Sequence, residues 1–210
     1  MKIGIIGSGN IGETTARLFV NAGHQIALSN SKGPQSLESL VASIGQNSAK
    51  AMTVQEAIAF GDVILLALPW RKREVLRSLP SELLKNKIVI DATNPYSENF
   101  EVIDLGNSTS SEEVAKELPG ARIVKAFNTM YYETLRTESR KSKDDRLVLF
   151  VAGDDADAKS VVSKLIEDIG FTPVDTGSLI EGGRKQQPGS PIYNNPMTVE
   201  VAHKRLSEIA

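Results

Sequence analysis

The 210-residue chain contains no cysteine and only two histidines, His24 and His203. The absence of cysteine excludes disulfides, thiolate metal ligands and cysteine nucleophiles. Two histidines so far apart in the chain argue against a histidine metal centre and against a Ser-His-Asp triad. We therefore expect no metal site and no chemistry that depends on a thiol.

The chain also lacks a strong charge of either sign and any long apolar run. A formal net charge of −2 gives no electrostatic reason to bind nucleic acid or an anionic membrane. No apolar segment approaches the length of a transmembrane helix. Residues 1–6 are strand-like and lead directly into a glycine motif, so we expect no signal peptide and a cytoplasmic protein.

That glycine motif, Gly-Ser-Gly-Asn-Ile-Gly at residues 7–12, is the feature around which the chain is organised. An apolar run precedes it and a helical pattern follows without a gap. In such a strand–turn–helix unit, Gly7 permits the tight turn, Gly9 lets a pyrophosphate approach the backbone, and Gly12 lets the helix pack on the strand. The free N–H groups of the helix N-terminus then attract phosphate. The motif predicts a bound dinucleotide.

Short apolar runs alternate with helical patterns along the rest of the chain. Strands are expected at 1–6, 25–29, 49–52, 62–68, 87–92, 122–127, 147–152 and 172–175, and helices at 13–22, 36–44, 54–60, 71–78, 111–118, 157–169 and 198–209. This alternation predicts a doubly wound Rossmann fold, a mainly parallel sheet of about eight strands with helices on both faces.

We expect one NADP-binding domain over residues 1–210. Residues 136–146 form a charge run that we interpret as a solvated loop. From residue 177 the chain becomes rich in Gly, Pro and Asn, and we expect residues 177–210 to be a C-terminal loop and short helix that cover the cleft.

The end of the second predicted strand favours NADP(H) over NAD(H). An NAD enzyme usually has an Asp or Glu there, which binds the ribose 2′-hydroxyl. This chain has Ser29, Asn30, Ser31 and Lys32 instead. Small hydroxyl and amide groups beside a cation suit a 2′-phosphate.

Polar and aromatic residues follow the later strands, where a nicotinamide would lie. Pro69 and Trp70 end the fourth strand, and Trp70 either packs against a ring or simply packs the helix start. The next residues, 71–73, are all basic; they either meet an acidic group or form a solvated face, and we favour the solvated face.

Lys125 lies in an apolar strand, where a lysine needs a partner or an exit to water. It serves as a proton donor of lowered pKa, pairs with a carboxylate on strand five or on a ligand, or reaches solvent at an edge. The residues leave these three interpretations open. Asp91, in strand five, is expected to be a structural hydrogen-bonding group rather than a base, because no histidine is available to partner it.

The shortage of histidine bears on the reaction. Alcohol dehydrogenation by a nicotinamide usually needs a general acid or base, whereas hydride exchange with a flavin-like ring needs mainly two stacked rings. A crevice of amides, hydroxyls and an aromatic residue favours the second reaction.

Six motifs together resemble the coenzyme F420-dependent NADP oxidoreductase family, and the oxidoreductase domain of the STEAP metalloreductases is similar. They are Gly-Ser-Gly-Asn-Ile-Gly at 7–12, Ser-Asn-Ser-Lys-Gly-Pro at 29–34, Ala-Leu-Pro-Trp at 67–70, Asp-Ala-Thr-Asn-Pro at 91–95, Lys-Ala-Phe-Asn-Thr at 125–129 and Gly-Asp-Asp at 153–155.

The resemblance implies direct hydride transfer between NADPH and a flavin or deazaflavin acceptor such as coenzyme F420, usually in a homodimer. It implies contacts to the pyrophosphate from Ser8, Asn10 and Ile11, and contacts to the 2′-phosphate from residues 29–32. The nicotinamide site that it implies comprises Leu68, Pro69, Trp70, Asn94 and Asn128.

Two other functions stay open at this point. One is an NADPH-dependent reductase of a small carbonyl or imine substrate, with Lys125 as proton donor. The other is an NADP-sensing Rossmann protein without turnover. In each case the partner is a small molecule rather than nucleic acid or a membrane.

Overall fold

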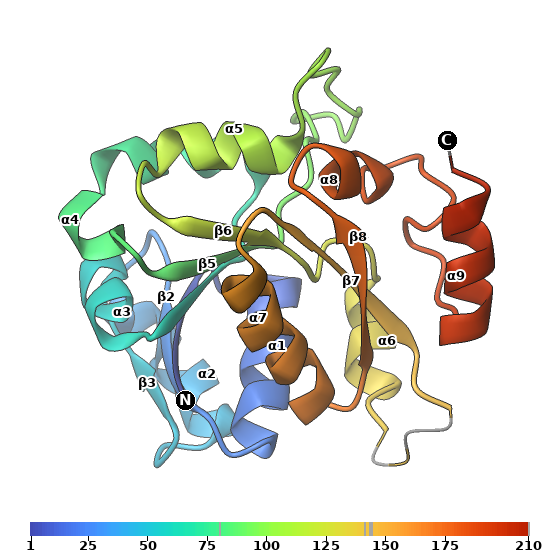
Figure 1. The fold of residues 1–210 in the computed structure, drawn as a ribbon. Helices are drawn as coiled ribbons and strands as arrows, with labels where there is room; N and C mark the ends of the chain where they lie inside the picture. The colour runs from blue at the N-terminus through green and yellow to red at the C-terminus, as the bar shows by residue number, and fades with distance from the viewer. Residues whose placement is uncertain (80, 141, 143–144, 210) are drawn as a thin grey trace.

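An eight-stranded sheet forms the centre of the computed structural model, which describes residues 1–79, 81–140, 142 and 145–209 (Figure 1). The strands are β1 (Lys2–Ile6), β2 (Gln25–Ser29), β3 (Ala49–Ala51), β4 (Val63–Leu66), β5 (Ile88–Asp91), β6 (Arg122–Lys125), β7 (Val148–Gly153) and β8 (Thr172–Gly177). Their order across the sheet is β3-β2-β1-β4-β5-β6-β7-β8, and β6–β7 is the antiparallel pair among parallel neighbours. The predicted Rossmann fold is confirmed.

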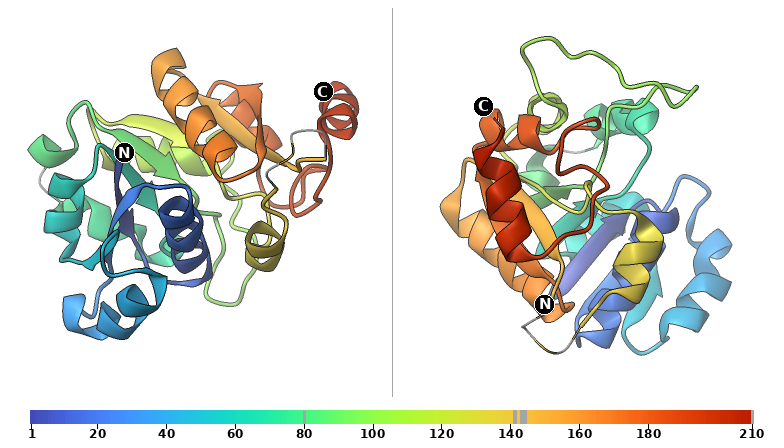
Figure 2. Two further views of the ribbon diagram at one scale, coloured as in Figure 1. Left: turned by 90° about the horizontal axis from the view of Figure 1, so that it is seen from below. Right: turned by 90° about the vertical axis from the view of Figure 1, so that its right-hand side faces the viewer.

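Helices cover both faces of this sheet (Figures 1 and 2). They are α1 (Asn10–Asn21), α2 (Glu38–Ile44), α3 (Val54–Phe60), α4 (Ser81–Leu84), α5 (Ser110–Glu117), α6 (Tyr132–Thr137), α7 (Ala156–Asp168), α8 (Glu181–Lys185) and α9 (Val199–Ser207), with 3₁₀ helices η1 (Pro34–Leu37) and η2 (Trp70–Ser78). Alternate residues of β4 divide between two apolar layers, because side chains along a strand point to opposite faces. Val63 and Leu65 pack in the layer of α1 and α7, while Ile64 and Leu66 pack in the layer of α3 and α5.

Local sequence signals account for several element ends. Thr53 and Glu56 form a capping box at the start of α3, in which Thr53 Oγ1 accepts from the Glu56 N–H at 3.3 Å and Glu56 Oε2 accepts from the Thr53 N–H at 2.9 Å. Asp155 caps α7 by accepting a hydrogen bond from the Ala158 N–H at 2.9 Å. Pro173 lies in β8, which is an edge strand, where a residue without an N–H donor is tolerated.

Three helices were not predicted. Helix α4 lies between the helix predicted at 71–78 and the strand predicted at 87–92. Helix α6 extends into the predicted solvated loop at 136–146, so that prediction is wrong for Arg136 and Thr137. Positions 141, 143 and 144 of the same prediction lie outside the described residues. Helix α8 contains two glycines, which disfavour a helix locally, so the sequence did not indicate it. One of them, Gly182, packs against β7 at a distance that allows no side chain, because a Cβ there would lie 2.8 Å from Ala152 Cβ.

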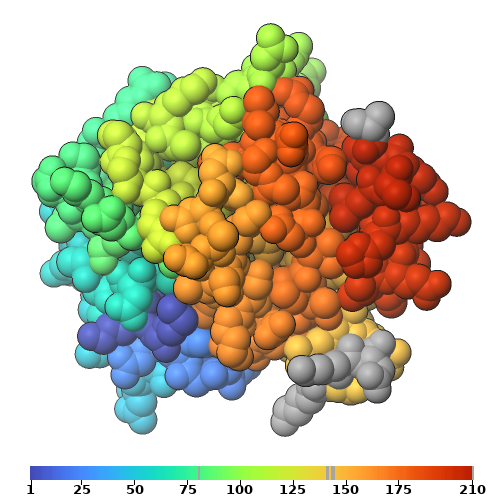
Figure 3. All heavy atoms as spheres, viewed as in Figure 1, coloured from blue at the N-terminus to red at the C-terminus, as the bar shows by residue number. Residues whose placement is uncertain are grey.

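The C-terminal segment packs along the outer strands of the sheet. Ile192, Met197 and Ala202 form a small apolar cluster with side chains of β7 and β8, and α9 stands at that edge of the molecule (Figure 3). That this segment covers the cofactor cleft stays a prediction. No helix in the described residues is long and apolar enough to cross a membrane.

Candidate cofactor and acceptor site

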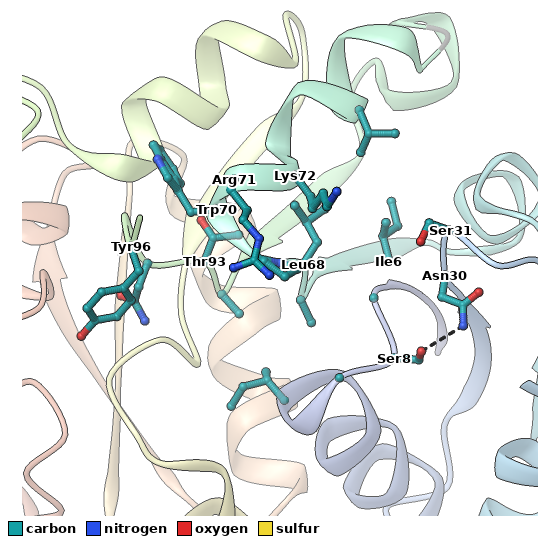
Figure 4. Close-up of a pocket in the computed structure, with 18 of the residues that line it drawn as sticks. Ile6, Ser8, Asn30, Ser31, Leu68, Trp70, Arg71, Lys72, Thr93 and Tyr96 are labelled. Carbon is teal, nitrogen blue, oxygen red and sulfur yellow. Dashed lines mark hydrogen bonds between the residues drawn. The ribbon is translucent and has the colours of Figure 1, made fainter. Parts of the chain in front are cut away.

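A cavity of about 640 Å³ opens at the carboxyl ends of β1, β4 and β5 (Figure 4). Its walls are the glycine turn after β1, the end of β2, the segment from β4 into η2, and the loop after β5. It lies between β1 and β4, where the strand order changes direction: β2 and β3 follow on one side of β1, and β5 and the later strands follow on the other side of β4. Such a switch point is where doubly wound sheets bind ligands.

The three glycines of the motif have three different environments. Gly7 has a φ of +113°, a conformation that L side chains rarely adopt. A Cβ on Gly12 would lie 1.9 Å from the Gly7 carbonyl oxygen, so helix and turn are in direct contact there. A Cβ on Gly9 would meet no described atom within 4 Å. These environments agree with a turn glycine, a packing glycine and an open approach for pyrophosphate.

Helix α1 presents its N-terminus to the cavity. It begins at Asn10, with Gly9 as N-cap, and within the described chain no side chain caps this end. The first-turn N–H groups therefore have no partner inside the helix and carry the positive end of its dipole. Ser8, Asn10 and Ile11 line the cavity beside them. A helix end of this kind favours a bound anion such as phosphate.

Asn30 links the end of β2 to the glycine turn. Its Nδ2 donates to Ser8 Oγ at 3.2 Å, and its Oδ1 accepts from the Lys32 N–H at 2.9 Å (Figure 4). Asn30 and Ser31 both line the cavity, and the position carries no acid that would repel a phosphate. The residues fit a 2′-phosphorylated dinucleotide.

Four residues that were predicted to contact the cofactor do not line the cavity: Gly12, Ser29, Lys32 and Asn128. Ser29 is fully buried, and its hydroxyl donates to the Ile5 carbonyl oxygen at 2.9 Å, so its side chain faces the sheet. Lys32 is exposed at the turn beside Ser31. Gly12 is the packing glycine described above, and Asn128 is buried behind Asn94.

The other predicted nicotinamide residues, Leu68, Pro69, Trp70 and Asn94, do line the cavity. Trp70 is only 3% exposed, and the Arg73 guanidinium lies 4.3 Å from its ring centroid. Trp70 is therefore a packed residue at the helix start that also forms part of the cavity wall. The basic residues after it were expected to form a solvated face. Arg71 and Lys72 are exposed, as expected, but both also line the cavity (Figure 4).

Asn94 and Asn128 face each other at the ends of β5 and β6. The Asn94 Nδ2 donates to the Asn128 carbonyl oxygen at 3.0 Å, and the Asn128 Nδ2 donates to Asn94 Oδ1 at 3.1 Å and to the Gln186 carbonyl oxygen at 2.8 Å. Asn128 thus holds Asn94 and the C-terminal segment in place, which explains why it is absent from the cavity wall.

The loop after β5 forms part of the site, which was not predicted from the sequence. Tyr96, Ser97 and Phe100 line the cavity, and a single bridge between Tyr96 and Val102 folds this loop back on itself. Phe100 has a φ of +60° and is 80% exposed, which is unusual for so large an apolar ring. Aromatic residues in an otherwise polar loop were the available signal.

Lys125 is fully buried and belongs to a closed polar cluster. Its Nζ donates to Asp91 Oδ2 at 3.0 Å, to Ser110 Oγ at 2.9 Å and to the Thr93 carbonyl oxygen at 2.5 Å. Burial lowers the pKa of Lys125, and Asp91 opposes that shift. Of the three interpretations, the structure shows the pair with a strand-five carboxylate, and Lys125 does not line the cavity.

Asp91 is a structural hydrogen-bonding group in this structure. Besides Lys125, it accepts from the Thr93 N–H at 2.9 Å, the Thr93 hydroxyl at 2.6 Å and the Ser111 hydroxyl at 2.6 Å. These bonds tie the end of β5 to the start of α5. They fix the backbone of the segment that carries Thr93 and Asn94 into the cavity.

Fold and site together define a dinucleotide-binding Rossmann protein, and comparison with known proteins narrows this class. A family model described as NADP oxidoreductase, coenzyme F420-dependent, matches residues 2–95. The F420-dependent NADP reductase of Methanothermobacter thermautotrophicus is 28% identical over 209 residues, which cover 93% of this chain and 88% of that reductase. The crystal structure of hypothetical protein SMa0349 from Sinorhizobium meliloti superposes with a TM-score of 0.84, at 35% identity and 94% coverage of both chains.

Metalloreductase STEAP3 of Rattus norvegicus is 31% identical over 179 residues, which cover 85% of this chain but 34% of that protein. The chain thus spans about a third of the length of this relative. The resemblance to the coenzyme F420-dependent NADP oxidoreductase family is confirmed over residues 2–95, which the family model matches, and the Methanothermobacter reductase aligns with most of the chain.

Proposed function

We propose that this protein transfers hydride directly between NADPH and a flavin or deazaflavin acceptor of the F420 type. The name of the Methanothermobacter relative, an F420-dependent NADP reductase, supports F420 as acceptor. The chemistry of the cavity wall supports the same reaction and separates it from the alternatives.

The residues of the cavity wall would hold the cofactor in one orientation. Asn30 and Ser31 would bind the adenosine 2′-phosphate, and Gly9 with the N-terminus of α1 would bind the pyrophosphate. Leu68 and Asn94, at the ends of β4 and β5, would then border the nicotinamide. Exposed Lys32 adds a cation near the 2′-phosphate end.

The proposal rests on the residue composition of the cavity wall. Among the described residues that line it, none is Asp, Glu or His, and the ionisable side chains are those of Arg71, Lys72 and Tyr96. Ring-to-ring hydride transfer needs two rings stacked at the right distance rather than a carboxylate or imidazole base. The carbonyl or imine alternative gains no support, because Lys125 is held by Asp91 away from the wall.

The direct test follows the absorbance of NADPH with F420, FMN, FAD and riboflavin as separate acceptors. The proposal expects turnover with at least one ring acceptor and none with simple ketones or imines. Turnover with carbonyl or imine substrates alone would contradict it. NADPH binding without turnover in every mixture would instead support the NADP-sensing alternative.

Cofactor choice is tested by binding. We expect NADPH to bind more tightly than NADH, and we expect Asn30→Asp to reverse the order, because it puts a carboxylate beside the 2′-phosphate. Asn47→Asp, at an exposed position away from the cavity, is the matched control and should change neither affinity. Tighter NADH binding by the unmodified protein would overturn the assignment.

We further propose that residues 1–210 act as one NADP-binding domain and that residues 177–210 close the acceptor end of the cleft. The contact of Asn128 with Gln186 supports this placement. A homodimer and a cytoplasmic location stay predictions, which sedimentation and cell fractionation test.

A further inference from the structure

A short chain of hydrogen bonds connects the C-terminal segment to one end of the cavity. The hydroxyl oxygens of Tyr96 and Tyr193 are 3.2 Å apart, and the Asn94 Nδ2 donates to the Tyr193 hydroxyl at 3.3 Å. Asn94 and Tyr96 line the cavity, whereas Tyr193 comes from the segment after α8. Neither phenol is among the residues assigned to the phosphates or the nicotinamide of the cofactor.

The Asn94 amide acts on Tyr193 only as a donor. Its Nδ2 must face the Asn128 carbonyl oxygen, which can only accept, and its Oδ1 receives the Asn128 Nδ2. The second Nδ2 hydrogen then points to Tyr193, whose oxygen accepts it. In the structure the Tyr96 hydroxyl donates to Tyr193 as well; because both hydroxyls rotate, a ligand that accepts from Tyr96 lets Tyr193 donate to Tyr96 in turn, and each bond polarises the next.

Tyr96 lies at the end of the cavity away from Ser8, Asn30 and Ser31 (Figure 4). In the proposed function those three residues mark the pyrophosphate and the 2′-phosphate. Tyr96 therefore lies at the nicotinamide end, where an acceptor ring stacks. Burial, followed by the hydrogen bond with Tyr96, raises the pKa of Tyr193 above the ordinary tyrosine value, so Tyr193 stays protonated in any ordinary assay.

We propose that Tyr96 donates a hydrogen bond to the carbonyl edge of the bound acceptor ring, and that Tyr193 is a positioning residue that orients the Tyr96 hydroxyl. This inference rests on the proposed function. The ligand that it implies is a ring with a hydrogen-bond-accepting edge conjugated to its hydride-accepting atom.

A donor at this edge of the acceptor matters because negative charge develops there during hydride transfer. The C–H bond at C4 of the dihydronicotinamide breaks, its electron pair forms the new bond at the central ring of the acceptor, and negative charge appears at the conjugated carbonyl edge. NADPH is oxidised to NADP⁺, the acceptor is reduced, and a proton from solvent completes the product. A donor aimed at that edge stabilises the transition state more than the oxidised acceptor.

The test compares Tyr96→Phe and Tyr193→Phe with the unmodified protein, using the ring acceptor that supports turnover. We expect Tyr96→Phe to lower kcat about 10- to 100-fold, because a lost donor to developing charge has an effect of this size. Dissociation constants for NADPH should stay within about twofold, since the cofactor contacts are unchanged. Tyr193→Phe should lower kcat about 3- to 10-fold, and the double variant should match Tyr96→Phe, because the two residues act as one unit.

Tyr132→Phe is the matched control, since it removes a hydroxyl from a tyrosine outside the cavity wall, and it should keep full activity. Melting temperatures of all variants exclude unfolding as the cause. The inference would be overturned by an unchanged kcat in Tyr96→Phe, or by NADPH binding that weakens in proportion to the loss of turnover. It would also be overturned if the loss of kcat in the double variant equalled the product of the two single losses. Failure of the proposed function has a different signature, namely no NADPH oxidation by the unmodified protein with any ring acceptor.

Discussion

Replacing Lys125 by methionine removes one partner of an ion pair in which both side chains are 0% exposed. Methionine has a similar length and is apolar, so the cavity left behind is small. The change leaves Asp91 buried with its charge and without its cation. It also leaves the Thr93 carbonyl oxygen and the Ser110 hydroxyl without the lysine donor.

The expected loss is about 3–5 kcal/mol in the free energy of unfolding, which is the usual effect of breaking a buried pair on one side. The lower part of this range is the better estimate here, because Asp91 keeps its bonds from Thr93 and Ser111. A loss of about 3 kcal/mol is a large part of the stability of a typical domain. A double variant, Lys125→Met with Asp91→Asn, should recover part of the lost free energy of unfolding, because the uncompensated buried charge is then gone.

Urea titrations followed by circular dichroism measure these free energies. Lys50→Met, which replaces an exposed lysine on β3, is the matched control and should lie within about 0.5 kcal/mol of the unmodified protein. NADPH binding of Lys125→Met should be retained where the variant is folded. A fully stable Lys125→Met variant that binds NADPH but has no turnover would refute the structural role and make Lys125 the proton donor.

Three further predictions concern the glycine turn, a surface ion pair and the loop after β5. Alanine at Gly9 should weaken NADPH binding without changing stability, whereas alanine at Gly12 should destabilise the fold, because its Cβ would lie 1.9 Å from a carbonyl oxygen; equal effects on folding would contradict this. The Arg122 guanidinium holds the pKa of Asp155 well below its usual range, so the stabilisation is present above the ordinary aspartate pKa and is lost as the pH falls through the lowered one. Melting temperatures of Asp155→Asn and the unmodified protein should therefore differ most at neutral pH, and the difference should begin to shrink below about pH 4 and go on shrinking as the pH falls further; a constant difference would count against the pair. Phe100→Ala should lower kcat/KM for the acceptor while the melting temperature stays unchanged, because this ring is 80% exposed; normal kinetics would show that the ring does not meet the acceptor.

Features that depend on residues close together in the sequence could be predicted. The glycine turn was predicted at the right position because it follows from local backbone chemistry, and the capping box of Thr53 has the same local origin. The alternation of strands and helices predicted the doubly wound class of the fold, although not the order of the strands in the sheet. The position of Asn30 follows from its distance along the chain from the glycine motif.

Features that depend on contacts between distant segments were not accessible. Every residue of β2 from Ile26 to Ser29 is buried, so the strand shows no alternation from which the direction of the Ser29 side chain could be read. The partner of Lys125 stayed open because it depends on register, and the structure aligns Asp91 with Lys125 across β5 and β6. Tyr96 and Tyr193 meet only because the C-terminal segment folds back to Asn94.

The most direct test of the account follows the hydrogen itself. NADPH that carries deuterium at C4 of the dihydronicotinamide, prepared separately for each face, is oxidised with a deazaflavin in ordinary water. The reduced deazaflavin holds the transferred hydrogen on carbon, where it does not exchange with solvent, and mass spectrometry measures it. Direct hydride transfer predicts a deuterium atom in the product from one of the two labelled cofactors. A reduced acceptor that carries only solvent hydrogen in both reactions would contradict the proposed function.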